Sequence, residues 1–185
     1  MSRINTPESI ETSPQASQPL LEMVKKQLGS IPNLFRVVGN SPAALEGYLA
    51  LNGALAKSQI DAKTRERIAL LVAEINRCDY CLAAHTYLGK NVAKLEESEL
   101  DANRRGESRD ERAAAALRFA KEVVHERGHV SNSAVENVKK AGFSDGEVVE
   151  IVAIVALNTL TNYVNSVAET IVDFPKVSSI SKKIS

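Results

Sequence analysis

Apolar residues recur with helical spacing along most of the chain. From Leu20 through Val24 to Leu28, leucine and valine side chains return every three or four residues. That spacing places them on one face of a helix. Gly29 is a typical helix end, and Pro32 opens a new segment. The first part of the chain is therefore predicted to be helical.

Start and stop signals mark further helices. Ser41 followed by Pro42 is a typical N-cap with proline at the first helical position, and Ser144 with Glu147 forms a capping box. The β-branched stretch 148–155 continues that capped segment, so we interpret it as helix rather than strand. The predicted helices cover approximately residues 20–28, 42–57, 61–75, 77–94, 108–126 and 145–172, and a further capping box stands at 133–136. The chain is predicted to be all-α.

The first residues differ from the rest in composition. They are rich in Ser, Thr, Pro, Gln and Glu and have few apolar anchors. We predict that residues 1–17 form a flexible N-terminal arm and that residues 18–185 form a single all-helical domain. A chain of 185 residues is long enough for one domain with a sizeable core.

Composition and charge are those of an ordinary soluble protein, with 44% hydrophobic and 25% charged residues. Lys and Arg together number 23, as do Asp and Glu, and there is no tryptophan. Nothing here favours nucleic acid or a membrane as a partner. No stretch reaches the ~20 apolar residues of a membrane helix, and the N-terminus lacks the apolar core of a signal peptide. We therefore expect a cytoplasmic location.

The candidate chemistry lies in a pair of cysteines. Cys78 and Cys81 are three residues apart, and they are the chain's only cysteines. Residues at this spacing share a helix face at about 5–6 Å, within reach of a disulfide. Such a bond closes so short a loop that it stabilises the fold little. A reversible redox pair is the better interpretation, because the cytoplasm keeps exposed dithiols reduced.

Neighbouring residues supply the means to activate a thiol. Asn76 is a plausible N-cap for a helix that carries both cysteines in its first turns, where the helix dipole lowers a thiol pKa, and Arg77 adds positive charge. His85 lies one turn beyond Cys81 and can exchange protons at neutral pH. Glu66 can accept a proton or orient the histidine, provided that the helix breaks near Asn76 so that the two converge.

Other interpretations of these residues remain open. The cysteines with His125 and His129 could bind zinc, although that spacing exceeds the usual one. Two inert buried cysteines are also compatible with the sequence, whereas c-type haem is excluded because Leu82 follows Cys81. On the last helix, Asn158, Asn162 and Asn165 form a polar stripe. We interpret it as a buried hydrogen-bonded seam rather than a substrate site.

Four stretches resemble one family. Glu66, Cys78, Cys81 and His85 match the active-site pattern of the alkylhydroperoxidase D-like proteins, a branch of the carboxymuconolactone decarboxylase superfamily. The matching stretches are Arg65–Ile68 with Cys78–His85, then Gly29–Arg36, Ser41–Leu45 and Asn162–Asn165. The resemblance covers roughly residues 18 to 175 and is closest to the peroxidase-related branch.

The resemblance implies an alkylhydroperoxidase D-like helical domain and a role for each residue. Cys81 is expected to be the attacking thiol and Cys78 the resolving thiol, with Glu66 and His85 as the proton relay. Tyr80 stands where the best-studied members carry a histidine, so it is an accessory candidate. The resemblance also implies a homo-oligomer, trimeric or hexameric, with electrons from a protein-bound lipoyl group that pass to a peroxiredoxin. Decarboxylation is not expected, because members with that activity lack the cysteine pair.

These observations favour a thiol peroxidase or dithiol-disulfide oxidoreductase. The expected substrate is a hydroperoxide or a disulfide, and the expected partner is an external dithiol reductant. We expect no cofactor and no bound metal. The alternatives are a non-catalytic stress or assembly protein on the same scaffold and a zinc-binding module.

Overall fold

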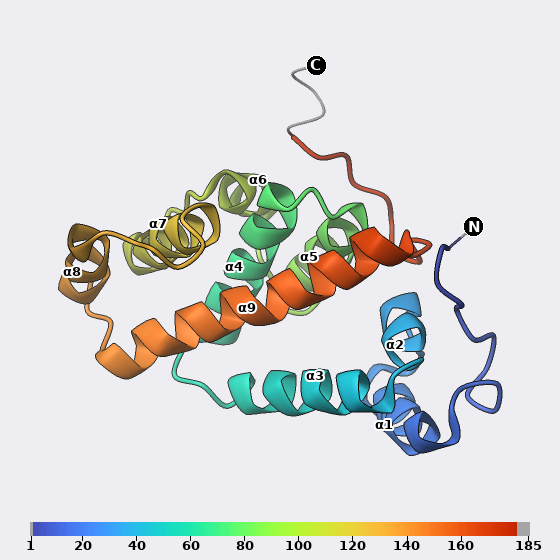
Figure 1. Ribbon diagram of the computed structural model, residues 1–185. Coiled ribbons are helices and arrows are strands. Elements are labelled where there is room, and N and C mark those ends of the chain that lie inside the picture. Colours follow the sequence, from blue (N-terminus) through green and yellow to red (C-terminus); the bar gives the residue numbers. More distant parts are fainter. Residues whose placement is uncertain (1, 181–185) are drawn as a thin grey trace.

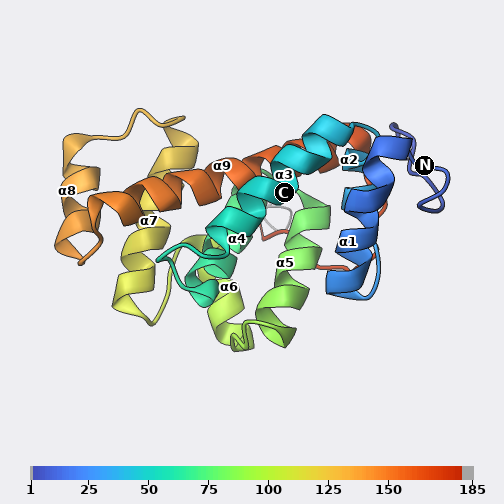
Figure 2. The ribbon, with the colours of Figure 1, turned by 90° about the horizontal axis from the view of Figure 1, so that it is seen from below.

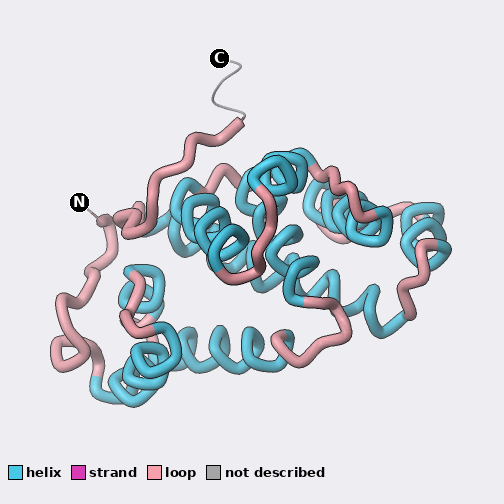
Figure 3. The backbone as a smooth tube through the Cα atoms, turned by 180° about the vertical axis from the view of Figure 1, so that it is seen from behind, coloured by secondary structure: helices cyan, strands magenta, loops and turns pink. Residues whose placement is uncertain are grey.

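A computed structural model describes residues 2–180, and within them every regular element is helical (Figures 1 and 3). The elements are a 3-10 turn η1 (Gln15–Ser17), α1 (Gln18–Leu28), α2 (Asn33–Val38), α3 (Pro42–Leu55), α4 (Ala62–Ile75), α5 (Asp79–Asn91), α6 (Glu97–Arg105), α7 (Glu111–His125), α8 (Asn132–Lys140) and α9 (Asp145–Ala168). The prediction of an all-α protein is confirmed.

Helix α4 is the centre of the fold because its sequence is apolar on all sides over one stretch. Every residue of 68–73 is buried, as expected of a helix without a polar face. It packs against α5, α6, α7 and α9. Asp61 caps its N-terminus by accepting a hydrogen bond from the backbone N–H of Thr64 at 3.0 Å. This central position holds Glu66 firmly in the helix assembly.

Helix α9 crosses the whole molecule in front of α4 (Figure 1). Its first turn lies near α8, and its last turn lies near α2. The capping box predicted at its start is present, with Ser144 and Glu147 bonded reciprocally. Figure 2 shows α4 and α5 side by side beneath α9, with α1 on the far side of α5. The C-terminal half of α9 is thereby placed over the cysteine helix.

The buried side chains form two clusters. One joins α4 to α7, α8 and α9, and the other surrounds the cysteines. The second cluster includes Cys78, Tyr80 and Cys81, and the tail residues Phe174 and Val177 pack against it. The dithiol is thus part of a hydrophobic core and not of an exposed loop.

Several predicted boundaries were wrong. Asp110, not Ser108, caps α7, because the Ser108 hydroxyl is bonded to the buried carboxylate of Glu99. Ser131 caps α8 in place of Ser133. Helix α9 ends at Ala168 rather than near residue 172, with the following residue in a left-handed conformation. Helices α2 and α6 were not predicted.

The N-terminal segment contacts the end of α9 and α2. The backbone N–H of Arg3 donates to the Ala168 carbonyl at 2.7 Å, and the Arg36 side chain donates to the Glu8 carbonyl at 2.7 Å. Ile10 is buried in the cluster around the cysteines. The flexibility of residues 1–17, and the division into that arm and a domain of 18–185, stay predictions.

Helix α9 has the length and composition of a membrane span, with a mean hydropathy of 1.4 over its most apolar window. From the sequence, no stretch was expected to reach the ~20 apolar residues of a membrane helix. Half of that window is buried inside the protein. The position of α9 in the core accounts for the apolar residues of its buried face.

Candidate active site

The turn between α4 and α5 sets the position of both cysteines. Asn76 is the C-cap of α4 and not, as predicted, the N-cap of α5. Arg77 adopts a left-handed conformation with φ of 53°, which reverses the chain. Cys78 is itself the N-cap, and its sulfur accepts a hydrogen bond from the backbone N–H of Cys81 at 3.3 Å. The predicted break near Asn76 is present, and the dithiol stands at the start of a helix.

Both cysteines are free, buried thiols. Cys78 is 3% exposed and Cys81 is 2% exposed. The amide Nδ2 of Asn165, on α9, donates to the sulfur of Cys81 at 3.2 Å. A polar contact to this sulfur therefore comes from a helix that lies 84 residues away in sequence.

Glu66 and His85 meet beside the dithiol. The Nδ1 atom of His85 lies 3.0 Å from Oε2 of Glu66, and both side chains are about one-fifth exposed. Burial by itself would lower the pKa of His85. The negative charge of Glu66, the hydrogen bond between them and the charge of Cys81 together raise that pKa above its ordinary value. The histidine is therefore held ready to carry a proton near neutral pH.

The surroundings shift the pKa values of the two thiols in opposite directions. A hydrogen bond from Cys78 lowers the pKa of Cys81 most. Burial opposes this effect, and the charge of His85 and the amides of Asn165 and Asn162 lower the pKa further, to about 7. For Cys78, the hydrogen bond to Cys81 and burial raise the pKa. The geometry therefore favours a thiolate at Cys81 and a protonated thiol at Cys78.

The contacts of Tyr80 do not support a part in the proton relay. Its hydroxyl accepts a hydrogen bond from the backbone N–H of Leu34 at 3.1 Å, and its ring makes an edge contact with Phe174 at 5.8 Å. Burial raises the pKa of Tyr80. The side chain connects the cysteine helix to α2 and to the tail.

Sequence reasoning missed Tyr48, on α3. Burial raises the pKa of Tyr48, and the charges of Cys81 and Glu66 raise it further, which places this phenol beside both groups. Its ring contacts that of Phe35 at 5.7 Å. No local motif marks this residue, because α3 reaches the site only through the tertiary fold.

The asparagine stripe on α9 divides into two parts. Asn158 donates to the carbonyl of Ile154 in its own helix, at 2.8 Å. Asn162 accepts a hydrogen bond from the side chain of Asn76 at 3.0 Å, so it joins α9 to the turn before the cysteines. Asn162 makes the kind of hydrogen bond between elements that a buried seam predicts, whereas Asn165 contacts the sulfur itself.

The remaining candidate residues lie elsewhere. His125 is the last residue of α7, and His129 follows in the next turn. Among residues 2–180, no group of three or more His, Cys, Asp or Glu side chains is arranged to hold a metal ion.

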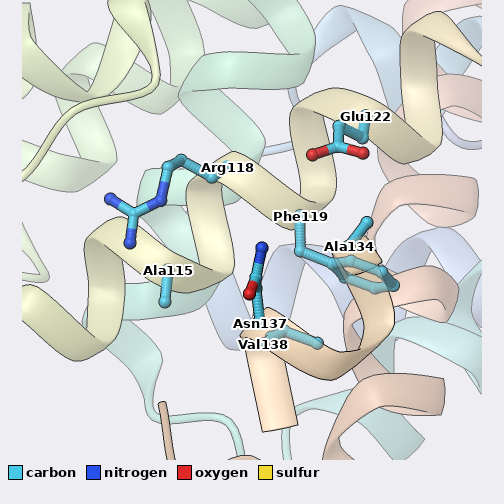
Figure 4. Close-up of a pocket in the computed structure, with 7 residues that line it drawn as sticks. All are labelled: Ala115, Arg118, Phe119, Glu122, Ala134, Asn137 and Val138. Atoms are coloured by element: carbon cyan, nitrogen blue, oxygen red, sulfur yellow. The ribbon is translucent and has the colours of Figure 1, made fainter. Parts of the chain in front are cut away.

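A surface hollow between α7 and α8 is separate from the dithiol (Figure 4). It is lined by Ala115, Arg118, Phe119, Glu122, Ala134, Asn137 and Val138. At about 80 Å³ it is well below the size of a usual ligand pocket. None of the proposed catalytic residues lines it.

Comparison with known proteins fits this site and fold. Residues 42–122 match the model of the carboxymuconolactone decarboxylase family. An uncharacterized protein of Haemophilus influenzae is 43% identical over 63 residues, a match that covers 34% of this chain and 50% of that protein. The chain thus spans about half the length of this curated relative.

Solved structures share the whole fold. An uncharacterized peroxidase-related protein from Ralstonia eutropha, described as an alkylhydroperoxidase AhpD core, superposes with a TM-score of 0.82 at 23% identity, over 93% of this chain and 92% of its own. A cysteine-to-alanine variant of the debrominase Bmp8, in complex with 2,3,4-tribromopyrrole, superposes with a TM-score of 0.77 at 20% identity, over 94% of each chain. The same scaffold therefore supports more than one activity.

The helical fold, with a Cys-x-x-Cys pair at the start of a helix, is the alkylhydroperoxidase D-like fold. Residues 42–122 carry the match to the carboxymuconolactone decarboxylase family, and the chain as a whole shares the fold of the alkylhydroperoxidase AhpD core.

Proposed function

We propose that the chain is a dithiol oxidoreductase that reduces hydroperoxides at Cys81. The observation that carries the proposal is the contact of 3.0 Å between Glu66 and His85 beside a thiol whose pKa is lowered to about 7. A thiolate next to a proton donor is what peroxide reduction requires. The scaffold alone does not distinguish this activity from others, because a debrominase shares it.

In the first step, the Cys81 thiolate attacks one peroxide oxygen. The S–O bond forms as the O–O bond breaks, and the leaving alkoxide takes a proton from the His85 imidazolium, with Glu66 stabilising that cation. The peroxide is reduced by two electrons to an alcohol, and Cys81 becomes a sulfenic acid.

In the second step, the Cys78 sulfur attacks the sulfenyl sulfur. The S–S bond forms as the S–O bond breaks, and hydroxide leaves as water with the Cys78 proton. An external dithiol then returns two electrons by thiol-disulfide exchange. We propose a protein-bound lipoyl group as that reductant, acting with a peroxiredoxin in the cytoplasm.

Thiol titration tests this scheme. The protein is treated with one equivalent of hydroperoxide and its free thiols are counted. We expect the wild type to lose two thiols rapidly and Cys81→Ser to react at the slow rate of an ordinary buried thiol. Equal, slow loss from both proteins would contradict the proposal. Because a neighbour of this fold is a debrominase, a brominated pyrrole belongs in the same substrate panel.

Two alternatives make different predictions. If the chain is a non-catalytic stress or assembly protein, Cys78→Ser and Cys81→Ser should both leave its biological activity and its partner binding unchanged. A zinc-binding module would contain stoichiometric zinc by elemental analysis of protein purified without an affinity tag. Stoichiometric zinc would rule out the redox cycle.

We further propose that copies of the chain assemble through the outer face of α9. Exposed, uncharged residues return there every three or four positions, at Val149, Val152, Ala156, Leu160, Tyr163 and Val167. This stripe is about 27 Å long. The neighbouring helix α3 is largely exposed and carries a single charged residue, Glu46. A long face without charge is complementary to a second copy of itself.

A further inference from the structure

Asn162 and Asn165 differ from the other buried amide of α9 in having unused hydrogen-bonding atoms. Asn162 is 0% exposed and Asn165 is 3% exposed. The Nδ2 atom of Asn162 and the Oδ1 atom of Asn165 are buried without a partner among the described residues. Buried polar atoms are nearly always paired, so an unpaired donor and an unpaired acceptor on adjacent turns require an explanation.

Both amides face the same reacting atom. Nδ2 of Asn165 donates to the Cys81 sulfur at 3.2 Å, and Asn162 also lowers the pKa of that thiol. Asn162 has its oxygen fixed by the side chain of Asn76 at 3.0 Å. This bond leaves the Nδ2 group of Asn162 free to serve a ligand on the sulfur.

The free atoms are complementary to a hydroxyl-like oxygen. An S–OH or O–OH group accepts hydrogen bonds and donates one. The Nδ2 group of Asn162 can donate to such an oxygen, and the Oδ1 atom of Asn165 can accept its hydrogen. An apolar lining would stabilise neither the oxygen nor its proton.

We propose that Asn162 and Asn165 form a subsite for the oxygen atom that a hydroperoxide transfers to Cys81. This inference rests on the proposed peroxide reduction. The subsite binds the oxygen while the S–O bond forms and the O–O bond breaks. It then holds the resulting Cys81 sulfenic acid until the Cys78 sulfur displaces that oxygen as water. The ligand class is therefore a hydroperoxide, followed by its sulfenyl product.

The test compares an oxidant that delivers oxygen with one that does not. Rates of Cys78–Cys81 disulfide formation are measured with hydrogen peroxide and with diamide, which oxidises dithiols without transferring oxygen. The ratio of the two rates removes effects on thiolate content and access. We expect Asn162→Leu to lower this ratio at least tenfold. Asn158→Leu, a buried amide on the same helix that bonds only within it, is the matched control and should leave the ratio unchanged.

A second variant guards against misfolding, because Asn162 also binds Asn76. Asn162→Asp keeps the oxygen that accepts from Asn76 but replaces the free N–H donor, and it should lower the ratio at least tenfold while the circular dichroism spectrum stays that of the wild type. In a Cys78→Ser background, each variant should also trap less Cys81 sulfenic acid with dimedone.

The outcomes separate the subsite from the proposed function. Wild-type protein that reacts with diamide but not with peroxide would contradict the proposed function. Wild-type protein that reacts with both, with an unchanged ratio in folded Asn162→Leu and Asn162→Asp, would overturn the subsite alone.

Discussion

Cys78 and Cys81 are three residues apart, yet their surroundings shift their pKa values in opposite directions. The largest cause is one hydrogen bond, which the Cys78 thiol donates to the Cys81 sulfur. Cys78 therefore keeps its proton, and that proton stabilises the negative charge of the Cys81 thiolate. Asn165 and His85 add to the stabilisation at Cys81 only. The attacking and resolving roles implied by the family resemblance are thus consistent with the electrostatics, and they stay predictions.

The pH dependence of alkylation tests this division. With a pKa of about 7 in place of 9.0, Cys81 is about half thiolate at pH 7 instead of about 1%. We expect the rate of monobromobimane labelling at Cys81, mapped by mass spectrometry, to rise with pH around a midpoint near 7. Cys78→Ala should move the midpoint upward, because the largest lowering contribution is lost. A wild-type midpoint near 9 would contradict the assignment.

We expect Glu66 to act through His85. Its carboxylate raises the pKa of the histidine, so Glu66→Gln should lower that pKa and reduce the imidazolium available at neutral pH. We expect a loss of about 100-fold in the rate of peroxide reduction at pH 7. The loss should shrink below the ordinary histidine pKa, where the imidazole is protonated without help. A pH-independent loss, or none, would show that the carboxylate does not serve the relay.

At the scale of elements, the turn between α4 and α5 decides whether the site forms. Glu66 stands on one helix and His85 on the other, and the left-handed Arg77 reverses the chain between them. The backbone N–H of Arg77 donates to the carbonyl of Glu74 at 3.1 Å. The conformation and the hydrogen bond both restrict which residues this position accepts.

Substitution at Arg77 tests that restriction. Arg77→Pro forces a negative φ and removes the N–H donor, so it should destabilise the fold by about 3 kcal/mol or more and abolish peroxide reduction. Arg77→Gly adopts the left-handed conformation without strain, so its stability should stay within about 1 kcal/mol of the wild type. Thermal unfolding followed by circular dichroism measures both. Equal stability of the two variants would contradict the role given to this turn.

Local signals predicted the elements better than the contacts between them. The capping box of Ser144 and Glu147 was correct because both partners lie within one turn. Asn76 was assigned wrongly because its amide is used by Asn162, a residue that no local pattern places nearby. Ser108 failed as a cap for the same reason, since Glu99 takes its hydroxyl. The contact of Asn165 with Cys81 could not be predicted from the sequence, because it depends on how α9 crosses α5.

At the scale of the whole molecule, the outer face of α9 is an uncharged stripe left uncovered in residues 2–180. Leu160 is 48% exposed at the middle of that stripe, and Tyr163 and Val167 continue it toward the active-site end. The asparagines at the sulfur lie on the opposite side of the same helix. Assembly through this face would therefore hold α9, and with it the amides at Cys81, in a fixed position.

Introducing a charge into the stripe tests the assembly. Leu160→Glu leaves the monomer fold intact because the side chain is half-exposed, but it places a charge in the proposed interface. We expect association to weaken by about 3 kcal/mol, more than 100-fold. Size-exclusion chromatography with light scattering reports the mass. Val92→Glu, at an exposed apolar residue outside the stripe, is the control and should keep the wild-type mass. Identical masses for all three proteins would contradict the interface.

The central claim is that the sulfurs of Cys78 and Cys81 cycle between a dithiol and a disulfide by reducing a peroxide. Peptide mapping by mass spectrometry after a single equivalent of hydroperoxide tests it most directly. The account predicts that the peptide with both cysteines loses the mass of two hydrogen atoms and regains it with dihydrolipoamide. A peptide that stays unchanged, or that gains oxygen without forming the internal disulfide, would contradict the account.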